Sequence, residues 1–255
     1  MQDKFRELSD SRWEVIEKII NDQRVRQHSL RTIMNAILWI NYTGSQWRNM
    51  ESKYPPWQSV YYYFRKWKRN GLWEELLDAL VVQERRRQQR QDSPSLVAVD
   101  SQSTKKVAFV YQDTGIDGGK KVNGRKRHIA VDTLGLPWAI CVTGANVSDN
   151  QGGCELIRRL KGKVPCMRKV AADHGYKETF IDYVTEKTGW EVEIVQRPES
   201  TKSFVAEKNR WPVERSYGWL NFTRRLCRDY EKTTESSEAM IKIATISFLD
   251  NRLAP

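Results

Sequence analysis

Two aspartates follow short apolar runs and could contribute to one chemical site. The runs at 96–99 and 169–172 each predict a buried strand, and the next residues are Asp100 and Asp173. Ligands and catalytic groups gather at the carboxyl ends of strands in open α/β sheets. A third carboxylate, Glu214, lies in a predicted helix and could approach the same point.

Converging carboxylates repel one another, so such a site is stable only when cations fill it. Oxygen ligands of this kind select Mg²⁺ or Mn²⁺. Two such ions can hold the attacking and departing oxygens of an in-line phosphoryl displacement.

Taken singly, each of these acids has a simpler interpretation. An aspartate after a strand is more often a turn or capping residue, and Glu214 could be a solvated helix residue. Three rival acids, Asp132, Asp149 and Asp182, are interpreted as hairpin-turn, helix-cap and helix-surface residues.

The elements around these acids predict a mixed α/β sheet with helices on both faces. Strands are expected at 127–131 and 137–142, joined as a hairpin through 132–135, and again at 192–195. Helices are expected at 153–161, 176–187, 208–225 and 237–251, the first capped by Ser148 or Asp149.

The first part of the chain has helical periodicity instead. Helices are expected from Ser9 or Asp10, from Ser29 to Thr43, over 46–50, over 59–69 and over 73–82. A helix rich in basic and aromatic residues near the end of this series suggests a helix-turn-helix arrangement. We therefore predict a helical DNA-binding domain at 1–83, a basic linker at 84–95 and a catalytic domain at 96–255.

The charge balance indicates a polyanionic partner. The formal net charge is +11 at pH 7, and such a charge attracts nucleic acid and supplies phosphate contacts.

Four widely spaced cysteines without a CxxC pair argue against a zinc ribbon or a disulfide scaffold. The chain has no apolar run of membrane-spanning length and no secretory signal at its start, so we expect it in the cytosol.

Three blocks of sequence, taken in order, carry a resemblance to a known family. They are Asp100-Ser101-Gln102-Ser103 with 124–135, then 172–176, then 210–215 continuing through 219–220, 224–226 and 229–231. Together they resemble the bacterial insertion-sequence transposases of the DDE class, in the IS-five-like (IS4/IS5-type) branch. The similarity runs from about residue 8 to residue 251.

This resemblance implies a ribonuclease-H-like core whose acidic triad maps onto Asp100, Asp173 and Glu214. It implies a transposase that uses two Mg²⁺ or Mn²⁺ ions to cleave transposon ends and join the freed 3′ hydroxyl to target DNA. The partner would be double-stranded DNA, held by a homodimer or larger assembly in the bacterial cytosol at the nucleoid. No nucleotide cofactor is expected, because the stretch from Gly119 to Lys126 lacks the Gly-Lys-Ser/Thr ending of a P-loop.

The helix around the glutamate departs from the family pattern. Related transposases carry a Tyr, Arg, Glu, Lys signature, which Arg210 and Glu214 fit, whereas Glu207 and Asn221 stand where Tyr and Lys are expected. Arg224 and Arg225 are expected to contact phosphates instead. The other expected DNA contacts come from the basic loop at 120–127, the basic-aromatic helix and the region around the acids: Lys120, Lys121, Arg125, Lys126, Arg127, Arg65, Lys66, Lys68, Arg69, Lys177, Arg210 and Arg215.

Three alternatives remain open at this point. The same acids could serve a metal-dependent nuclease that never joins DNA. Residues 8–79 could act alone in a DNA-binding regulator without catalysis. The chain could also be an inactive remnant, although its motifs continue unbroken to residue 251.

Overall fold

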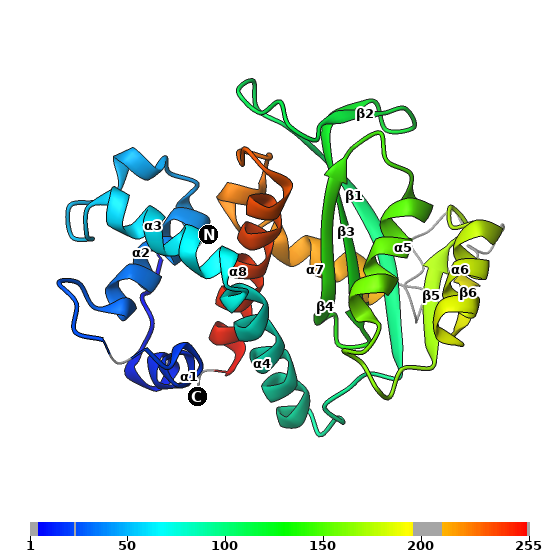
Figure 1. The fold of residues 1–255 in the computed structure, drawn as a ribbon, viewed down its shortest axis with the longest axis horizontal. Coiled ribbons are helices and arrows are strands. Elements are labelled where there is room, and N and C mark those ends of the chain that lie inside the picture. Colours follow the sequence, from blue (N-terminus) through cyan, green and yellow to red (C-terminus); the bar gives the residue numbers. More distant parts are fainter. Residues whose placement is uncertain (1–4, 23, 196–210, 254–255) are drawn as a thin grey trace.

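The computed structural model describes residues 5–22, 24–195 and 211–253, which form a helical part beside a sheet part (Figure 1). The helices are α1 (Asp10–Ile20), α2 (Leu30–Thr43), α3 (Trp57–Arg69), α4 (Leu72–Arg87), α5 (Asp149–Leu160), α6 (Glu178–Thr188), α7 (Trp211–Leu220) and α8 (Thr234–Leu253), with short 3-10 turns η1 (Trp47–Asn49) and η2 (Arg224–Leu226). The strands are β1 (Leu96–Lys105), β2 (Gly115–Asp117), β3 (Val122–Asp132), β4 (Pro137–Gly144), β5 (Lys169–Asp173) and β6 (Glu191–Val195).

The strands form one mixed sheet around β1. Its partner β3 runs antiparallel to both β1 and β4, whereas β5 and β6 run parallel to β1. The order across the sheet is therefore β4-β3-β1-β5-β6, with the short β2 paired to the start of β3. The predicted hairpin is confirmed, because β3 and β4 are joined directly after Asp132.

Local capping signals fix several helix ends where the sequence predicts them. The side chain of Ser9 accepts a hydrogen bond from the backbone N–H of Arg12 at the start of α1. Ser29 caps α2 in the same way, and Gly44 ends that helix in the left-handed conformation. Ser148 forms a reciprocal capping box at the start of α5.

Side-chain alternation along β3 divides the two faces of the sheet. His128 and Lys126 point to one face, where α5 packs, whereas Arg125 and Arg127 point to the other. Figure 1 shows α5 and α6 on the first side and α7 and α8 on the second. The predicted sheet with helices on both faces is confirmed.

The helical part is built around α8, which comes from the far end of the chain. Helices α2, α3 and α4 all contact α8, which also packs on β4. Asn41 of α2 donates a hydrogen bond to the carbonyl oxygen of Met240 at 3.0 Å. Glu74 of α4 pairs with Lys242 of α8 at 2.7 Å. The hydrophobic core thus continues from the N-terminal helices through α8 to the sheet.

The segment 84–95 differs from the hinge that the sequence suggests. Helix α4 continues through Arg87, and both Glu84 and Arg85 are buried. Arg85 forms an ion pair with Asp132 at the end of β3, and its side chain also donates to the carbonyl oxygen of Gln91. A buried ion pair anchors this segment to the sheet.

Two further expectations on secondary structure are wrong. The basic stretch 120–127 is not a loop, because β3 begins at Val122 and pairs with β1, β2 and β4. The helix expected at 208–225 ends at Leu220 and is followed by a turn and η2, while residues 208–210 lie outside the described residues. None of the described helices has the length and apolar character needed to cross a membrane.

Candidate active site

The pairing of β1 with β5 brings the two predicted aspartates side by side. The parallel register matches Val97 with Val170 and Ala98 with Ala171. Asp100 lies two residues beyond Ala98, and Asp173 lies two residues beyond Ala171. Equal offsets along neighbouring parallel strands place both aspartates at the same level and on the same face.

Helix α7 packs against that face through Tyr217. This tyrosine is buried, and its hydroxyl donates to the carbonyl oxygens of Asp100 at 2.9 Å and Arg127 at 2.8 Å. Burial and the nearby carboxylate of Asp100 raise the pKa of Tyr217 well above its ordinary value, so the group remains a donor. Glu214 precedes Tyr217 by three residues, which places both on one helix face. Glu214 thus shares the face of α7 that carries Tyr217, and its role as the third acid stays a prediction.

Backbone N–H groups donate to the carboxylates of both aspartates, one within strand β1 and the other in the turn after β5. The backbone N–H of Ser101 donates to Oδ1 of Asp100 at 2.7 Å. The backbone N–H of Gly175 donates to Oδ1 of Asp173 at 2.9 Å, which forms a tight turn after β5. Hydrogen bonds that hold a carboxylate in one orientation prepare it to act as a ligand.

A buried polar cluster supports β1 from the opposite face of the sheet. The hydroxyl of Ser101 donates to Oδ1 of Asp149 at 2.7 Å, and Lys126 pairs with the same oxygen at 3.0 Å. Nε2 of His128 lies 3.0 Å from the hydroxyl of Thr143. The N-cap of α5 is Ser148 and not Asp149; Asp149, in the first turn of α5, ties the residue after Asp100 to that helix.

The imidazole ring of His128 packs closely against α5 at Gly152. A Cβ atom on Gly152 would lie only 2.1 Å from Cε1 of the His128 ring, so any larger residue there would displace the ring or the helix. Burial lowers the pKa of His128 to about 4 despite the opposing influence of Asp149. The imidazole is therefore neutral at pH 7.

We expect acid to destabilise the fold through His128. The unfolded chain binds this proton near pH 6.5 but the folded chain only near pH 4, so stability is lost as pH falls through that window. Lowering the pH from 7 to 4 should reduce the free energy of unfolding of the wild type by about 3 kcal/mol relative to His128→Gln. Buried Asp250, whose pKa is raised to about 6 by burial, acts with the opposite sign.

Urea denaturation of both proteins at several pH values measures this difference, and the contribution of Asp250 cancels in the comparison. A difference in stability that stays constant between pH 7 and pH 4 would contradict a neutral, buried His128.

The acids fit a magnesium site as neighbouring oxygen ligands. Mg²⁺ is usually held by one or two protein carboxylates together with substrate phosphates and water, and Asp100 and Asp173 can supply such a pair. Over residues 5–22, 24–195 and 211–253, no three His, Cys, Asp or Glu side chains are gathered closely enough to hold an ion. Participation of Glu214 thus remains a prediction.

The predicted DNA-contacting cations fall into distinct environments. The exposed ones are Lys120, Lys121, Lys177, Arg224, Arg65 and Arg69. Lys66 and Lys68 are half-buried, and Arg210 lies outside the described residues. Arg215 is also half-buried: its guanidinium lies between the rings of Trp211 and Trp219 and donates to the carbonyl oxygen of Leu134 at 2.7 Å.

Four predicted phosphate contacts need correction, because these side chains are buried with protein partners. Arg125 donates to Asp229 and Ser237, and Arg127 donates to the carbonyl oxygen of Leu226. Lys126 is tied to Asp149 and to the carbonyl oxygen of Val147. Arg225 pairs with Glu231 at 2.7 Å and donates to the carbonyl oxygen of Ser45. A side chain enclosed in this way cannot reach a phosphate without unfolding its surroundings.

Sequence reasoning also missed residues that position the site. The double hydrogen bond of Tyr217 was not predicted, although its three-residue spacing from Glu214 was a usable signal. Asp132 shapes the hairpin turn as predicted, by accepting from the backbone N–H of Leu134, but its ion pair with Arg85 is not predicted. No local pattern shows that these two residues, 47 positions apart, meet in the interior.

The strand order and the placement of the acids define a ribonuclease-H-like domain. In it, parallel strands β5 and β6 extend an antiparallel β4-β3-β1 unit, with acids on β1 and at the end of β5.

Residues 91–249 match the family model of the transposase DDE domain. Residues 8–77 match a second model, described as "Putative transposase of IS4/5 family". The chain belongs to the DDE transposase family, as its motifs predict. Transposases of this family generally use divalent metal ions.

Two individual proteins are also similar to this chain. The "Putative transposase for insertion sequence element IS402" of Burkholderia cepacia is 35% identical over 127 residues, which are 47% of this chain and 60% of that protein. A solved structure entitled "Crystal structure of the Mos1 Strand Transfer Complex" aligns over 95% of this chain and 83% of its own, with 14% identity and a TM-score of 0.31. That structural likeness is too low to bear on fold or function.

Proposed function

We propose that this protein is a DNA transposase that cleaves transposon ends and joins the freed 3′ hydroxyl to target DNA. One observation carries the proposal. Asp100 and Asp173 each lie two residues beyond Ala98 and Ala171, which pair with each other on the parallel strands β1 and β5. Family membership supports the same reaction class. Two divalent ions, Mg²⁺ or Mn²⁺, when bound, would stabilise charge on the attacking and departing oxygens of phosphoryl transfer.

The side chains of the site have separate roles in this proposal. Asp100 and Asp173 would hold the ions, and Glu214 would complete the ligand set from α7. Tyr217 keeps α7 against β1 by donating to the backbone of Asp100. Asp149 steadies the same strand from the other face through Ser101. Water attacks the end phosphodiester first, and the released 3′ hydroxyl then attacks a phosphodiester of the target.

The exposed cations among the predicted DNA contacts are the proposed phosphate contacts. Lys177 follows the turn after Asp173, and Arg224 follows α7 in η2. Lys120 and Lys121 lie in the exposed turn between β2 and β3. Exposed ammonium and guanidinium groups bind phosphates through charge-assisted contacts that position DNA without reading its sequence.

Assays with labelled transposon-end DNA and a plasmid target test the proposal. With Mg²⁺ or Mn²⁺ the protein should cleave the end and yield target strands covalently linked to it, and chelator should stop both steps. Metal-dependent cleavage without linked product would favour a nuclease. DNA binding without cleavage in any metal would favour a regulator and overturn the proposal.

Removal of the Tyr217 hydroxyl should weaken both the fold and the reaction. Tyr217→Phe leaves two carbonyl oxygens without their shared donor, which should cost about 1–3 kcal/mol of stability. A displaced Asp100 should slow end cleavage by up to about a hundredfold, while affinity for the same DNA stays unchanged. Thermal melting, cleavage rates and DNA titrations measure these effects; unchanged cleavage would show that Tyr217 does not position the site.

A further inference from the structure

One stripe of α3 combines exposed basic, aromatic and amide side chains. Gln58, Tyr62, Arg65 and Arg69 are exposed and recur at intervals of four, three and four residues. The opposite stripe, formed by Val60, Phe64 and Trp67, is buried in the helical part. The helix therefore fixes one face in the protein and turns the other to solvent. Trp57 and Tyr61 flank the exposed stripe and line a shallow hollow with it.

Charge distinguishes α3 from the other N-terminal helices. Its sequence has four cationic side chains and no acidic one. By contrast, α1 has three acids against two cations, and α4 has four acids against three cations. Helix α2 is buried along most of its length. Of these helices, α3 alone offers a polyanion an exposed face that is not opposed by acids of the same helix.

The two arginines of the stripe have no other partner in the part of the chain that the structure describes. Neither Arg65 nor Arg69 forms an ion pair or a side-chain hydrogen bond with any described residue. The neighbouring lysines point away from the stripe and have partners: Lys66 lies 3.8 Å from Asp22, and Lys68 donates to the hydroxyl of Ser236 at 2.9 Å. The guanidinium forks of the stripe can therefore form bidentate contacts without first breaking an internal one.

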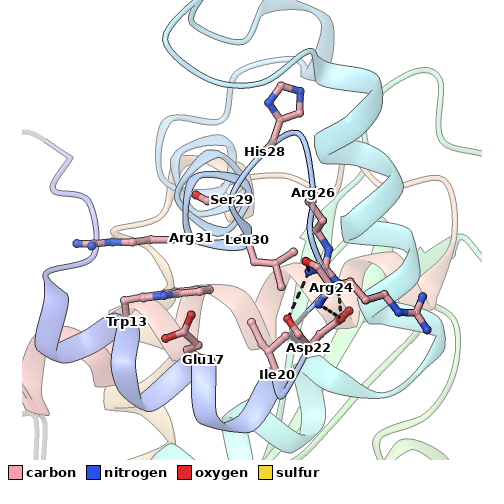
Figure 2. A pocket seen from close by; sticks show the side chains of 10 residues that line it. All are labelled: Trp13, Glu17, Ile20, Asp22, Arg24, Arg26, His28, Ser29, Leu30 and Arg31. Carbon is pink, nitrogen blue, oxygen red and sulfur yellow. Dashed lines mark hydrogen bonds and ion pairs between the residues drawn. The ribbon is translucent and has the colours of Figure 1, made fainter.

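A hollow between α1 and α2 is a weaker candidate for binding a polyanion. Figure 2 shows Arg26 turned onto Asp22, with which it forms an ion pair. Arg31, also on its wall, pairs with Asp10 at 2.5 Å. The carboxylate of Glu17 lines the same hollow. Two of its three arginines, Arg26 and Arg31, are paired and acids lie among them, so this hollow offers a polyanion less free positive charge than α3 does.

We infer that α3 is the helix that enters the major groove and reads base pairs of the transposon end, an assignment that rests on the proposed transposase function. The stripe from Gln58 to Arg69 spans about 16 Å along the helix, which corresponds to roughly five base pairs at 3.4 Å each. Arginine pairs with guanine and glutamine with adenine at base edges in that groove. Figure 1 places α3 beyond α8, away from the sheet, so base reading and strand cleavage occur on separate parts of the molecule.

Selection from a pool of duplexes with a randomised centre tests this inference. The wild type should enrich a preferred sequence, and affinities are then measured for that duplex and a scrambled one. Arg65→Ala or Arg69→Ala should reduce the preference by about 10- to 100-fold. Arg65→Lys should also lose preference, because lysine keeps the charge but lacks the planar fork. Arg90→Ala removes an equal charge from an exposed site outside α3 and should leave the preference intact.

The outcomes separate the inference from the proposed function. Failure to enrich any sequence, or an equal loss of affinity for both duplexes in Arg65→Ala, would overturn the assignment of α3 to base reading. Circular dichroism and melting of each variant show that it is folded. Asp173→Asn should keep the wild-type preference although it cleaves nothing. A wild type that prefers its sequence through α3 but never cleaves would instead overturn the transposase proposal alone.

Discussion

Replacement of Asp173 by Asn should reduce end cleavage and strand joining together by about a thousandfold or more. The substitution keeps the size of the side chain but removes the charge with which it would hold a divalent ion. Loss of such a ligand withdraws several kcal/mol of stabilisation from the transition state. Affinity for DNA should change little, because the exposed cations remain. Product yields on labelled ends, alongside binding titrations of the same duplex, measure both quantities.

Asp182→Asn is the matched control for this substitution. Asp182 is an exposed residue of α6, and Asp182→Asn removes the same charge from a residue that is not among the predicted acids. The control should cleave and join at the wild-type rate. Equal activity of Asp173→Asn and Asp182→Asn would remove Asp173 from the site.

Arg125→Met should destabilise the fold by about 3–5 kcal/mol, because it removes one member of a buried ion pair. The guanidinium of Arg125 is fully buried and reaches Asp229, Ser237 and the carbonyl oxygens of Glu231, Lys232 and Gln112. These contacts tie β3 to the start of α8 and to the segment after β1. Without the cation, Asp229 is left buried beside unpaired carbonyl groups. The melting temperature should fall by roughly 6 to 20 °C.

Lys121→Gln, four residues earlier, is the contrasting variant. Lys121 is exposed, so its loss should weaken DNA binding in low salt without changing the melting temperature. The reverse pattern, with Arg125→Met melting as the wild type but binding DNA more weakly, would restore Arg125 as a phosphate contact.

Local signals were sufficient to predict most of the elements and the neighbouring pair of acids. Short apolar runs identified β1 and β5, and the turn after Asp132 identified the β3–β4 hairpin. Serines before apolar periodic segments identified the starts of α1, α2 and α5. These features depend on side chains within a few residues, so a single sequence contains the information.

Long-range pairing could not be predicted, and it decides which cations are available to DNA. A basic run beside glycines suggested a loop, but Arg125 and Arg127 find partners more than 90 residues later. The sequence predicts Arg85 in a linker, but its partner in the fold is Asp132, 47 residues further along the chain. Lys120 and Lys121 share the same run and remain exposed. The charge of a segment therefore does not by itself distinguish a phosphate contact from a buried ion pair.

A metal-rescue experiment on Asp100 tests most directly whether these acids hold the ions that drive strand transfer. Asp100→Cys replaces a carboxylate with a thiolate, which suits the softer Mn²⁺ better than Mg²⁺. The account predicts wild-type joining in either metal, almost no joining by Asp100→Cys in Mg²⁺, and a recovery of at least about tenfold in Mn²⁺. Asp182→Cys should behave as the wild type in both. Joining by Asp100→Cys that is normal in Mg²⁺ would contradict a ligand role for Asp100 and with it the proposed catalytic site.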